Sequence, residues 1–419
     1  MGGFLDNIMK KILLALVVLF MVGCFGMTEE SISEQPAFYE EYEETEEAAE
    51  LLETTETEEP LEMVELPLVE KPNENELESL EKPDKIAEII AQMTVEEQIA
   101  QLFIVRMPTN LGQAEDLARQ GIGGFVFFAE NVHSIEQVQR DIERVQNSSR
   151  IPLFIAVDEE GGRVSRVGRL FEPTPPALRL TEQGFVFETH RTIGERLAFL
   201  GFNMNFAPVA DVRTNPANTV IGDRAFSNDA EVAAIMVALA VSGLRSADIL
   251  PVIKHFPGHG DTVQDSHYQA AFYLHDRERF DAVEALPFIS GIESGAAGVM
   301  IGHITAPLLT PDTPDTPIIF LDLIQEILRE EMGFEGIIIT DALDMGGLTN
   351  YFTAEEILVN AFLAGSDILL MPVDVQNAQN IMLNAYETGQ FSTERLHESL
   401  RRILEIKLNL PNFSGGDNG

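Results

Sequence analysis

The segment at residues 254–267 has a high density of side chains that can move protons or bind polar ligands. Its sequence, KHFPGHGDTVQDSH, holds three histidines, two aspartates and one lysine, and its Pro and Gly residues predict a loop. An imidazole titrates near neutral pH, and a partner carboxylate fixes its tautomer and stabilises its protonated form. Asp265 and His267 are two residues apart, so an extended backbone places both side chains on one side, where they can form a proton-transfer pair.

A second carboxylate follows a different apolar run. Asp341 comes directly after GIIIT at residues 336–340, so a buried strand would deliver its carboxylate to one end of a sheet. A carboxylate in that position can act as a nucleophile. Asp344 lies three residues further on, in the predicted loop, and we interpret it as a helix cap or a ligand for a hydroxyl group.

The loop at 254–267 also offers nitrogen and oxygen ligands suited to zinc. The candidate ligands are His255, His259, Asp261, Asp265 and His267. Their spacing lacks the HExxH pattern of a helical zinc site, and the Pro and Gly residues predict a loop that would need further ligands from elsewhere. We therefore predict no metal and interpret His259, which stands between two glycines, as a structural residue.

Eight short apolar runs predict the elements that position these groups. They cover residues 101–107, 121–128, 152–160, 204–212, 249–256, 298–304, 336–343 and 366–372. Continuous hydrophobicity is typical of parallel strands buried on both faces, and eight of them predict a (β/α)8 barrel with a closing helix at 392–408. A doubly wound open sheet is the competing fold. The barrel is favoured because polar residues end the strands, where barrels carry their active sites: Asp158, Asp211, Lys254, His255, His303 and Asp341.

Composition and charge limit the kind of protein. The chain has 419 residues, of which 45% are hydrophobic, enough for a large buried core. The net charge is −42, and about half of the acidic excess lies in a Glu- and Thr-rich stretch at 29–84. A nucleic-acid partner is not expected, because a phosphate backbone requires a basic face.

The N-terminal residues predict export. Lys10 and Lys11 precede the apolar run ILLALVVLFMVG, which is short for a membrane span and typical of a signal sequence. Residues 21–24 resemble the lipobox of bacterial lipoproteins, in which the cysteine, here Cys24, is lipidated. We expect a membrane lipoprotein on the extracytoplasmic face, with an ordinary signal and a secreted protein as the alternative. Met9 is an alternative translation start.

These patterns divide the chain into four segments. Residues 1–24 are the signal with its lipobox-like end, 25–83 a disordered acidic tether, 84–410 the barrel and 411–419 a flexible tail. Asp84 is the predicted N-cap of the first barrel helix, and Thr94 with Glu97 forms a capping-box pattern. A monomer is the expected state.

The 254–267 loop and the order of the other motifs resemble glycoside hydrolase family 3, in the branch of β-N-acetylhexosaminidases that remove terminal N-acetylglucosamine. The resemblance covers about residues 84–408. It implies that Asp341, after Thr340, is the nucleophile of a retaining mechanism and that His267, oriented by Asp265, is the proton donor. It implies no cofactor.

The resemblance also implies a set of sugar-binding residues. These are Asp158 and Arg166 in VDEEGGRVSR, Arg224 in IGDRAF, and Lys254 and His255 in the 254–267 loop. Arg163 and Glu160 are expected to form a supporting ion pair. The chain contains no Trp, so stacking on a sugar would fall to Phe or Tyr, which favours a compact pocket over a long polysaccharide cleft.

The implied activity is that of an exo-acting, retaining β-N-acetylhexosaminidase on cell-wall fragments (muropeptides) or chitin-type oligosaccharides. Two alternatives share the scaffold: an N-acetylglucosaminide phosphorylase, because a histidine donor does not repel phosphate as a carboxylate would, and a β-glucosidase. A third alternative, from another class, is a lipid-anchored saccharide-binding protein without catalysis.

Overall fold

The structure is a computed structural model that describes residues 84–410. The predicted signal sequence with Cys24, the acidic segment at 25–83 and the tail at 411–419 lie outside these residues. Within residues 84–410, no helix combines the length and the apolar character needed to cross a membrane.

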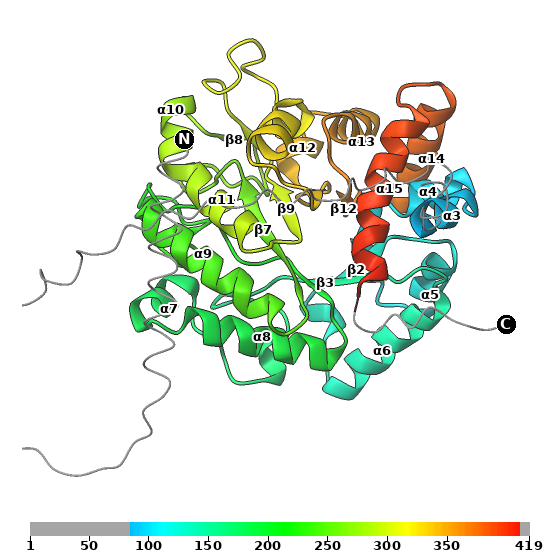
Figure 1. The fold of residues 1–419 in the computed structure, drawn as a ribbon, viewed down its shortest axis with the longest axis horizontal. Helices are drawn as coiled ribbons and strands as arrows, with labels where there is room; N and C mark the ends of the chain where they lie inside the picture. The colour runs from blue at the N-terminus through cyan, green and yellow to red at the C-terminus, as the bar shows by residue number, and fades with distance from the viewer. Residues whose placement is uncertain (1–83, 411–419) are drawn as a thin grey trace, which may run out of the picture. The chain divides into compact units, whose positions relative to one another are not determined.

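Eight parallel strands form the centre of the domain (Figure 1). They are β1 (Phe103–Arg106), β2 (Gly124–Phe127), β3 (Phe154–Val157), β6 (Met204–Asn205), β7 (Leu250–Phe256), β9 (Gly298–Ile301), β11 (Ile337–Thr340) and β12 (Leu369–Leu370). Their order in the sheet is β11-β9-β7-β6-β3-β2-β1-β12. The ring closes where Ile339 of β11 forms a parallel bridge with Ile368, the residue before β12. The predicted (β/α)8 barrel is confirmed, and the open doubly wound sheet is wrong.

Burial on both faces explains why the strands are continuously apolar. Every residue of β2, β3, β9 and β11 is buried. One set of side chains fills the barrel and the other lies under the surrounding helices, so neither face requires polar residues. Polar groups are therefore concentrated where the strands end.

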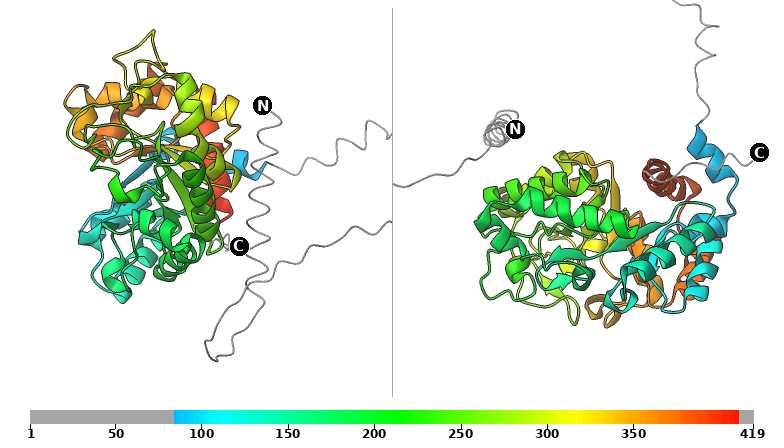
Figure 2. Two further views of the ribbon diagram at one scale, coloured as in Figure 1. Left: turned by 90° about the vertical axis from the view of Figure 1, so that its left-hand side faces the viewer. Right: turned by 90° about the horizontal axis from the view of Figure 1, so that it is seen from below.

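Helices surround the strands, as the turned views in Figure 2 show. They are α3 (Lys85–Ala91), α4 (Val95–Ala100), α5 (Leu111–Arg119), α6 (Ile135–Ser148), α7 (Ala177–Gln183), α8 (Val186–Leu200), α9 (Ala230–Arg245), α10 (Arg277–Arg279), α11 (Ala285–Glu293), α12 (Gly346–Thr349), α13 (Ala354–Leu363), α14 (Val375–Glu387) and α15 (Thr393–Leu408). Helix α9 packs between α8 and α11, and the closing helix α15 packs against α3 and α4.

The predicted helix starts are confirmed. The Asp84 carboxylate accepts hydrogen bonds from the N–H groups of Ile86 and Ala87, each at 3.1 Å, and so caps α3. Thr94 and Glu97 form the capping box of α4, with reciprocal bonds of 2.9 and 3.3 Å. These bonds satisfy backbone donors that the first turn of a helix leaves free.

Two short accessory sheets follow the barrel strands at their C-terminal ends. Strands β4 (Glu159–Gly161) and β5 (Val164–Ser165) form an antiparallel hairpin directly after β3. Strands β8 (Ala271–Phe272) and β10 (Ile304–Thr305) pair in parallel, and they follow β7 and β9. Both sheets lie in loops that carry predicted site residues or adjoin them.

Candidate active site

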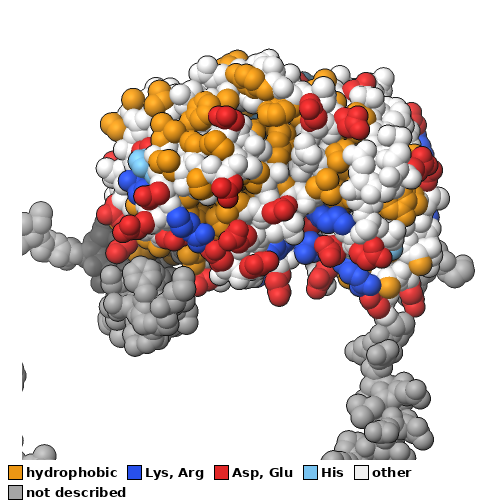
Figure 3. Space-filling model, turned by 90° about the horizontal axis from the view of Figure 1, so that it is seen from above, with side chains coloured by type: hydrophobic (Ala, Val, Ile, Leu, Met, Phe, Trp, Pro, Cys, Tyr) orange, Lys and Arg blue, Asp and Glu red, His pale blue; other side chains and the backbone are white. Residues whose placement is uncertain are grey.

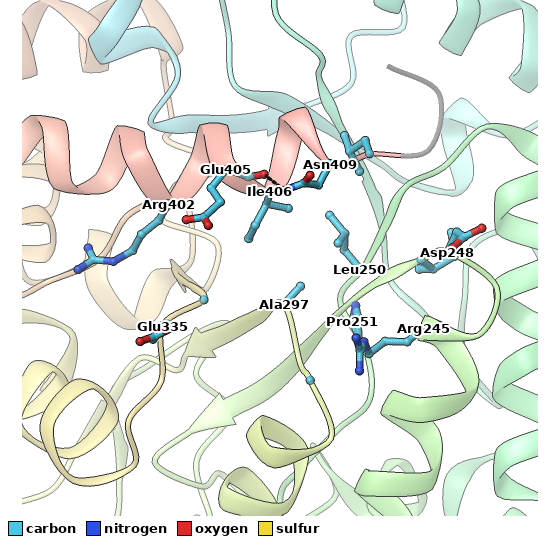
Figure 4. A pocket seen from close by; sticks show the side chains of 14 residues that line it. Arg245, Asp248, Leu250, Pro251, Ala297, Glu335, Arg402, Glu405, Ile406 and Asn409 are labelled. Carbon is cyan, nitrogen blue, oxygen red and sulfur yellow. Dashed lines mark hydrogen bonds between the residues drawn. The ribbon is translucent and has the colours of Figure 1, made fainter. Parts of the chain in front are cut away.

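The two ends of the barrel present different side chains. At the N-terminal ends of the strands, a cavity of about 490 Å³ lies between α15 and the residues that begin or precede β7, β9 and β11 (Figure 4). Leu250, Gly336 and Ile406 are part of its lining, which contains none of the predicted site residues. Those residues lie at or beyond the C-terminal ends of the strands, where (β/α)8 barrels carry their active sites.

Asp341 directly follows β11 and is held as an ionised carboxylate. Its Oδ1 accepts a hydrogen bond from the N–H of Ala342 at 2.7 Å. Burial raises the pKa of this carboxyl, but the fields of His303, His255 and His267 and the Ala342 bond outweigh it, so the pKa lies below its ordinary value. An ionised carboxylate is the form that a nucleophile requires.

Asp344 lies in the loop between Asp341 and α12. The expectation that it caps a helix is wrong, because Met345 is the N-cap residue of α12 and no side chain caps this helix. A cap at Asp344 would require α12 to begin at Met345, but the helix begins at Gly346. Burial raises the pKa of Asp344 and the nearby Asp341 charge adds to the effect, while Arg106 opposes it.

Asp265 and His267 form the predicted pair. Oδ1 of Asp265 accepts bonds from Nδ1–H of His267 at 2.7 Å and from the His267 backbone N–H at 3.0 Å. Because an ionised carboxylate only accepts, the proton lies on Nδ1, and Nε2 remains available for exchange with a substrate. Burial alone would raise the pKa of Asp265. The two hydrogen bonds from His267 and the positive charge of that ring outweigh burial, so the pKa lies below its ordinary value and the carboxylate is ionised. The His267 side chain is 58% exposed, so an incoming ligand can reach it.

Contacts between two loops bring this pair to Asp341. The carbonyl oxygens of Ser266 and His267 accept bonds from the N–H groups of Gly347 and Gly346, at 3.1 and 3.0 Å. A Cβ atom at Gly347 would lie 2.5 Å from the Ser266 carbonyl oxygen, so a larger residue could not make this contact without a shift. The loop after β7 is therefore tied to the loop that Asp341 opens, which holds the two groups on the same side of the barrel.

A buried network fixes the base of the 254–267 loop. Oδ1 of Asp211 accepts the backbone N–H of His259 at 2.6 Å, and Nε2 of His259 lies 3.0 Å from Oγ of Ser266. Nδ1 of the same ring lies 2.5 Å from Oγ1 of Thr262. Burial lowers the pKa of His259, and a neutral ring can donate to one hydroxyl and accept from the other. The contacts support the interpretation of His259 as a structural residue.

Asp211 also orients His255, a role that the sequence did not reveal. Its Oδ2 lies 2.8 Å from Nδ1 of His255, and its Oδ1 accepts the His255 backbone N–H at 3.3 Å. The Asp211 side chain is fully buried. The sequence shows that Asp211 lies near the end of an apolar run. Nothing in the neighbouring sequence indicates that its partner is His255.

Four of the charged residues form one network, in which Lys254 and Glu160 are buried and Asp158 and Arg224 are partly exposed. Nζ of Lys254 lies 2.6 Å from Oδ1 of Asp158 and 2.6 Å from Oε1 of Glu160. The guanidinium of Arg224 donates a hydrogen bond to each carboxylate oxygen of Glu160, at 2.8 and 2.9 Å. Burial raises the pKa of Glu160, but Arg224 and Lys254 lower it far more, so the carboxylate is ionised. The predicted binding residues Asp158, Lys254 and Arg224 thus lie in one network with Glu160. The sequence analysis expected only an ion pair between Glu160 and Arg163.

The predicted ion pair between Arg163 and Glu160 is wrong. Arg163 lies 3.5 Å from Asp223 and donates to the carbonyl oxygens of residues 219–221. Gly161 and Gly162 adopt φ values of 87° and 57°, and this turn separates Arg163 from the buried side of the hairpin. Arg163 is 48% exposed, whereas Glu160 is 5% exposed.

Arg166 has unused hydrogen-bonding capacity. Its Nε is buried without a hydrogen-bond partner among the described residues, and its guanidinium lies 5.5 Å from the centroid of the Phe128 ring. Its backbone is held by the Glu159 carboxylate, which accepts the N–H of Arg166 at 2.7 Å. A buried donor without a partner is unfavourable, so this guanidinium is suited to an oxygen-rich ligand.

His303 supports the residue that follows Asp341. Its Nε2–H donates to the carbonyl oxygen of Ala342 at 2.8 Å, while Nδ1 is buried without a partner in the described part of the chain. Burial lowers the pKa of this imidazole. The sequence places His303 at a strand end but indicates no role for it. Among residues 84–410, no group of three or more His, Cys, Asp or Glu side chains is arranged to hold a metal ion.

The network around Glu160 gives a first prediction. Glu160→Gln removes the charge that Arg224 and Lys254 share, so the free energy of unfolding should fall by about 3 kcal/mol. Urea denaturation followed by circular dichroism measures this loss. The matched control is Glu130→Gln, which breaks an exposed pair with Arg106 and should cost less than about 1 kcal/mol. Equal losses in the two variants would contradict the structural importance of the network.

Comparisons with known proteins agree with this geometry. Residues 94–406 match the glycosyl hydrolase family 3 N-terminal domain. The chain is 34% identical over 334 residues to β-hexosaminidase A of Pseudoalteromonas piscicida, covering 72% of this chain and 56% of that protein. It is 32% identical to β-hexosaminidase of Nitrosomonas eutropha, covering 66% of this chain and 81% of that protein.

A solved structure is similar as well. The family 3 β-N-acetylglucosaminidase from Paenibacillus sp. FPU-7 is 32% identical with a TM-score of 0.72, and the match covers 75% of this chain and 62% of that one. The matched region of this chain therefore spans little more than half the length of the Pseudoalteromonas and Paenibacillus proteins. The barrel, the site at its C-terminal end and the match over residues 94–406 together show that this chain belongs to glycosyl hydrolase family 3, among the β-hexosaminidases.

Proposed function

We propose that this chain is an exo-acting, retaining β-N-acetylhexosaminidase that removes terminal N-acetylglucosamine from oligosaccharides. The observation that carries the proposal is the pairing of an ionised Asp341 with the Asp265–His267 dyad on two loops tied to each other. A retaining glycosidase needs one carboxylate to attack the anomeric carbon and one proton donor for the departing oxygen. The names of the relatives, β-hexosaminidases and a β-N-acetylglucosaminidase, support the acetamido sugar.

The first step forms a covalent intermediate. A carboxylate oxygen of Asp341 bonds to the anomeric carbon as the glycosidic C–O bond breaks, and protonated His267 gives its Nε2 proton to the departing oxygen. Asp265 accepts the bond from Nδ1–H throughout and stabilises the imidazolium before the transfer. The leaving saccharide departs as an alcohol, and the imidazole becomes neutral.

The second step returns the enzyme to its starting state. Neutral Nε2 of His267 takes a proton from water as the water oxygen attacks the anomeric carbon, and the bond to Asp341 breaks. Two inversions at the same carbon give net retention. Asp158, Lys254 and Arg224 are proposed to bind the sugar hydroxyl groups, with His255 and the unpartnered Nε of Arg166 beside them.

The proposal is tested on purified protein. We expect hydrolysis of 4-nitrophenyl β-N-acetylglucosaminide with a kcat/KM at least about 100-fold above that for the corresponding glucoside, and a first product of β configuration in proton NMR. Preference for the glucoside would favour a β-glucosidase. Tight sugar binding without turnover would favour a non-catalytic saccharide-binding protein.

Phosphorolysis remains the second candidate on this scaffold, because the donor is a histidine. An imidazole adds no negative charge that would repel an incoming phosphate. Reactions with and without phosphate separate the two activities, since phosphorolysis yields N-acetylglucosamine 1-phosphate and hydrolysis yields the free sugar.

We also propose that the protein is anchored outside the cytoplasm through Cys24, the only cysteine of the chain. Mass spectrometry of the mature protein from its bacterial host should show an N-terminal cysteine carrying a diacylglyceryl group. Cys24→Ala should move the protein from the membrane fraction to the soluble fraction, while Ser31→Ala should leave it at the membrane. A free, unmodified Cys24 would contradict the anchor.

A further inference from the structure

His303 lies beside the loop that Asp341 opens, because β9 and β11 pair in register. The pairing ends with Ile301 opposite Thr340. His303 and Ala342 each stand two residues beyond that pair, so they lie opposite each other. The imidazole reaches the Ala342 carbonyl oxygen at 2.8 Å. A carbonyl oxygen only accepts hydrogen bonds, so the ring carries its proton on Nε2.

The main chain at Ala342 holds the nucleophile. The Ala342 N–H donates to Oδ1 of Asp341 at 2.7 Å. The peptide group that follows Ala342 is fixed at both ends, because His303 donates to its carbonyl oxygen and its N–H donates to Leu370 at 2.9 Å. Oδ2 of Asp341 accepts no hydrogen bond within residues 84–410 and is open to solvent. One carboxylate oxygen is thus bound, and the other is free to react.

His303 lies beneath the surface of the domain. Figure 3 views from above the side on which α12 and α13 lie at the top of Figure 1, and apolar side chains gather on that outer face. His303 is only 2% exposed, so its replacement leaves this face unchanged. Its Nδ1 is buried without a partner in the described part of the chain, and burial lowers the pKa of the ring. A proton on Nδ1 would be an unpaired buried charge, so the ring is neutral and forms no ion pair with the carboxylate.

We propose that His303 is a positioning residue for the nucleophile. By holding the Ala342 carbonyl oxygen, it keeps the Ala342 N–H on Oδ1 of Asp341 and leaves Oδ2 to attack the anomeric carbon. The inference rests on the proposed function and adds to its first step a residue that touches neither the sugar nor the proton in transfer.

Two amide variants separate the hydrogen-bond donor from the ring. In His303→Gln the amide nitrogen lies near the position of Nε2 and can still donate to Ala342, whereas in His303→Asn it lies near the position of Nδ1 and falls short. His303→Asn should lower kcat/KM for 2,4-dinitrophenyl β-N-acetylglucosaminide about 10 to 100-fold, and His303→Gln should stay within about threefold of wild type. This leaving group needs no proton, so the loss reports the attack by Asp341 and not the action of His267. The affinity for N-acetylglucosamine by calorimetry should change less than about twofold in both variants.

The titration of Asp341 is a second readout that needs no turnover. The titratable groups that face it are His303 after β9, His255 and His267 from β7 and its loop, and Asp344 from its own loop. A weaker N–H bond to Oδ1 stabilises the ionised form less, so the pKa of Asp341 should be higher in His303→Asn than in His303→Gln. Both variants lack the ring, so the difference reports the hydrogen bond. Carbon-13 NMR of protein labelled at the Asp carboxyl carbons measures it, with the signal assigned by Asp341→Asn.

His190 provides the matched control. It is 1% exposed, and its Nδ1–H donates to the Val186 carbonyl oxygen at 2.8 Å within α8. His190→Leu should lower resistance to urea but leave kcat/KM and the titration of Asp341 unchanged. Should His303→Asn not fold, His303→Leu takes its place, because leucine fills similar space without a donor.

Equal kcat/KM values and equal Asp341 titrations in folded His303→Asn and His303→Gln would overturn the inference. A loss of affinity for N-acetylglucosamine as large as the loss of kcat/KM would also overturn it, because His303 would then support sugar binding. Failure of the proposed function is a separate result, namely wild-type protein that cleaves no N-acetylglucosaminide. The titration would still decide whether His303 holds the main chain beside Asp341.

Discussion

Replacing Asp341 by Asn is expected to lower kcat for 4-nitrophenyl β-N-acetylglucosaminide by at least about 10⁴-fold. The amide has nearly the same shape but cannot form the glycosyl ester, so the first step loses its nucleophile. The fold should persist, because Asp341 contributes one backbone bond, from Ala342, and an amide oxygen can still accept it. Steady-state kinetics and the circular dichroism spectrum together separate lost chemistry from lost structure.

Azide distinguishes a missing nucleophile from a damaged site. Azide can bond to the anomeric carbon from the face that Asp341 occupied, while the aglycone leaves with the proton of His267, and the product is the α-glycosyl azide. We expect rescue of Asp341→Asn at molar azide concentrations. Asp344→Asn serves as the neighbouring control, and its kcat should fall by less than about tenfold. Loss of activity in Asp344→Asn with near wild-type turnover in Asp341→Asn would reverse the assignment.

Replacing His267 by Ala should give the second largest effect. For chitobiose, whose leaving group is a poorly acidic sugar hydroxyl, kcat/KM should fall by about 10² to 10⁴-fold. For 2,4-dinitrophenyl β-N-acetylglucosaminide the first step should change little, because that leaving group departs without a proton. The difference between the two substrates identifies His267 as the proton donor.

The pH profile gives an independent readout of the same residue. Activity requires Asp341 ionised and His267 protonated, so kcat/KM should fall on both sides of an optimum. The pKa of Asp341 lies below its ordinary value, so this carboxylate becomes protonated only well into the acid range. The enzyme should therefore lose activity on the acid side only there. His267→Ala should abolish the alkaline decline, whereas His397→Ala, on α15, should keep it. An unchanged alkaline limb in His267→Ala would rule out His267 as the proton donor.

Much of the fold follows from the sequence because strand burial leaves a local trace. A parallel strand covered on both faces must be apolar throughout, and runs such as residues 152–157 and 336–340 show this directly. The helix starts at Asp84 and Thr94 could also be predicted from the sequence. A capping side chain accepts hydrogen bonds from N–H groups within three residues of itself, so the whole motif is local. The closing of the ring between Ile339 and Ile368 has no such trace.

The proton-transfer pair is likewise local. Asp265 and His267 are two residues apart, so their contact forms within one short segment, and the sequence alone predicts the contact. The expected extended backbone is wrong, because residues 266–268 form a turn in which the Asp265 carbonyl oxygen accepts the N–H groups of Tyr268 and Gln269. The position of Asp341 at a strand end follows from the same reasoning. The resemblance to family 3 supplied their roles, and the experiments above test them.

The partners of the buried charges were decided by the tertiary structure. Glu160 meets Arg224 and Lys254, which lie 64 and 94 residues further along the chain, and the nearer Arg163 was the wrong choice. Asp211 reaches His255 and His259 across 44 and 48 residues. A buried charge must have a partner, because desolvation is costly, but that requirement does not say which residue provides it. The sequence by itself determined the strands, the caps and the Asp265–His267 pair; only the closed barrel, which brings the ends of distant strands together, decided which charges meet.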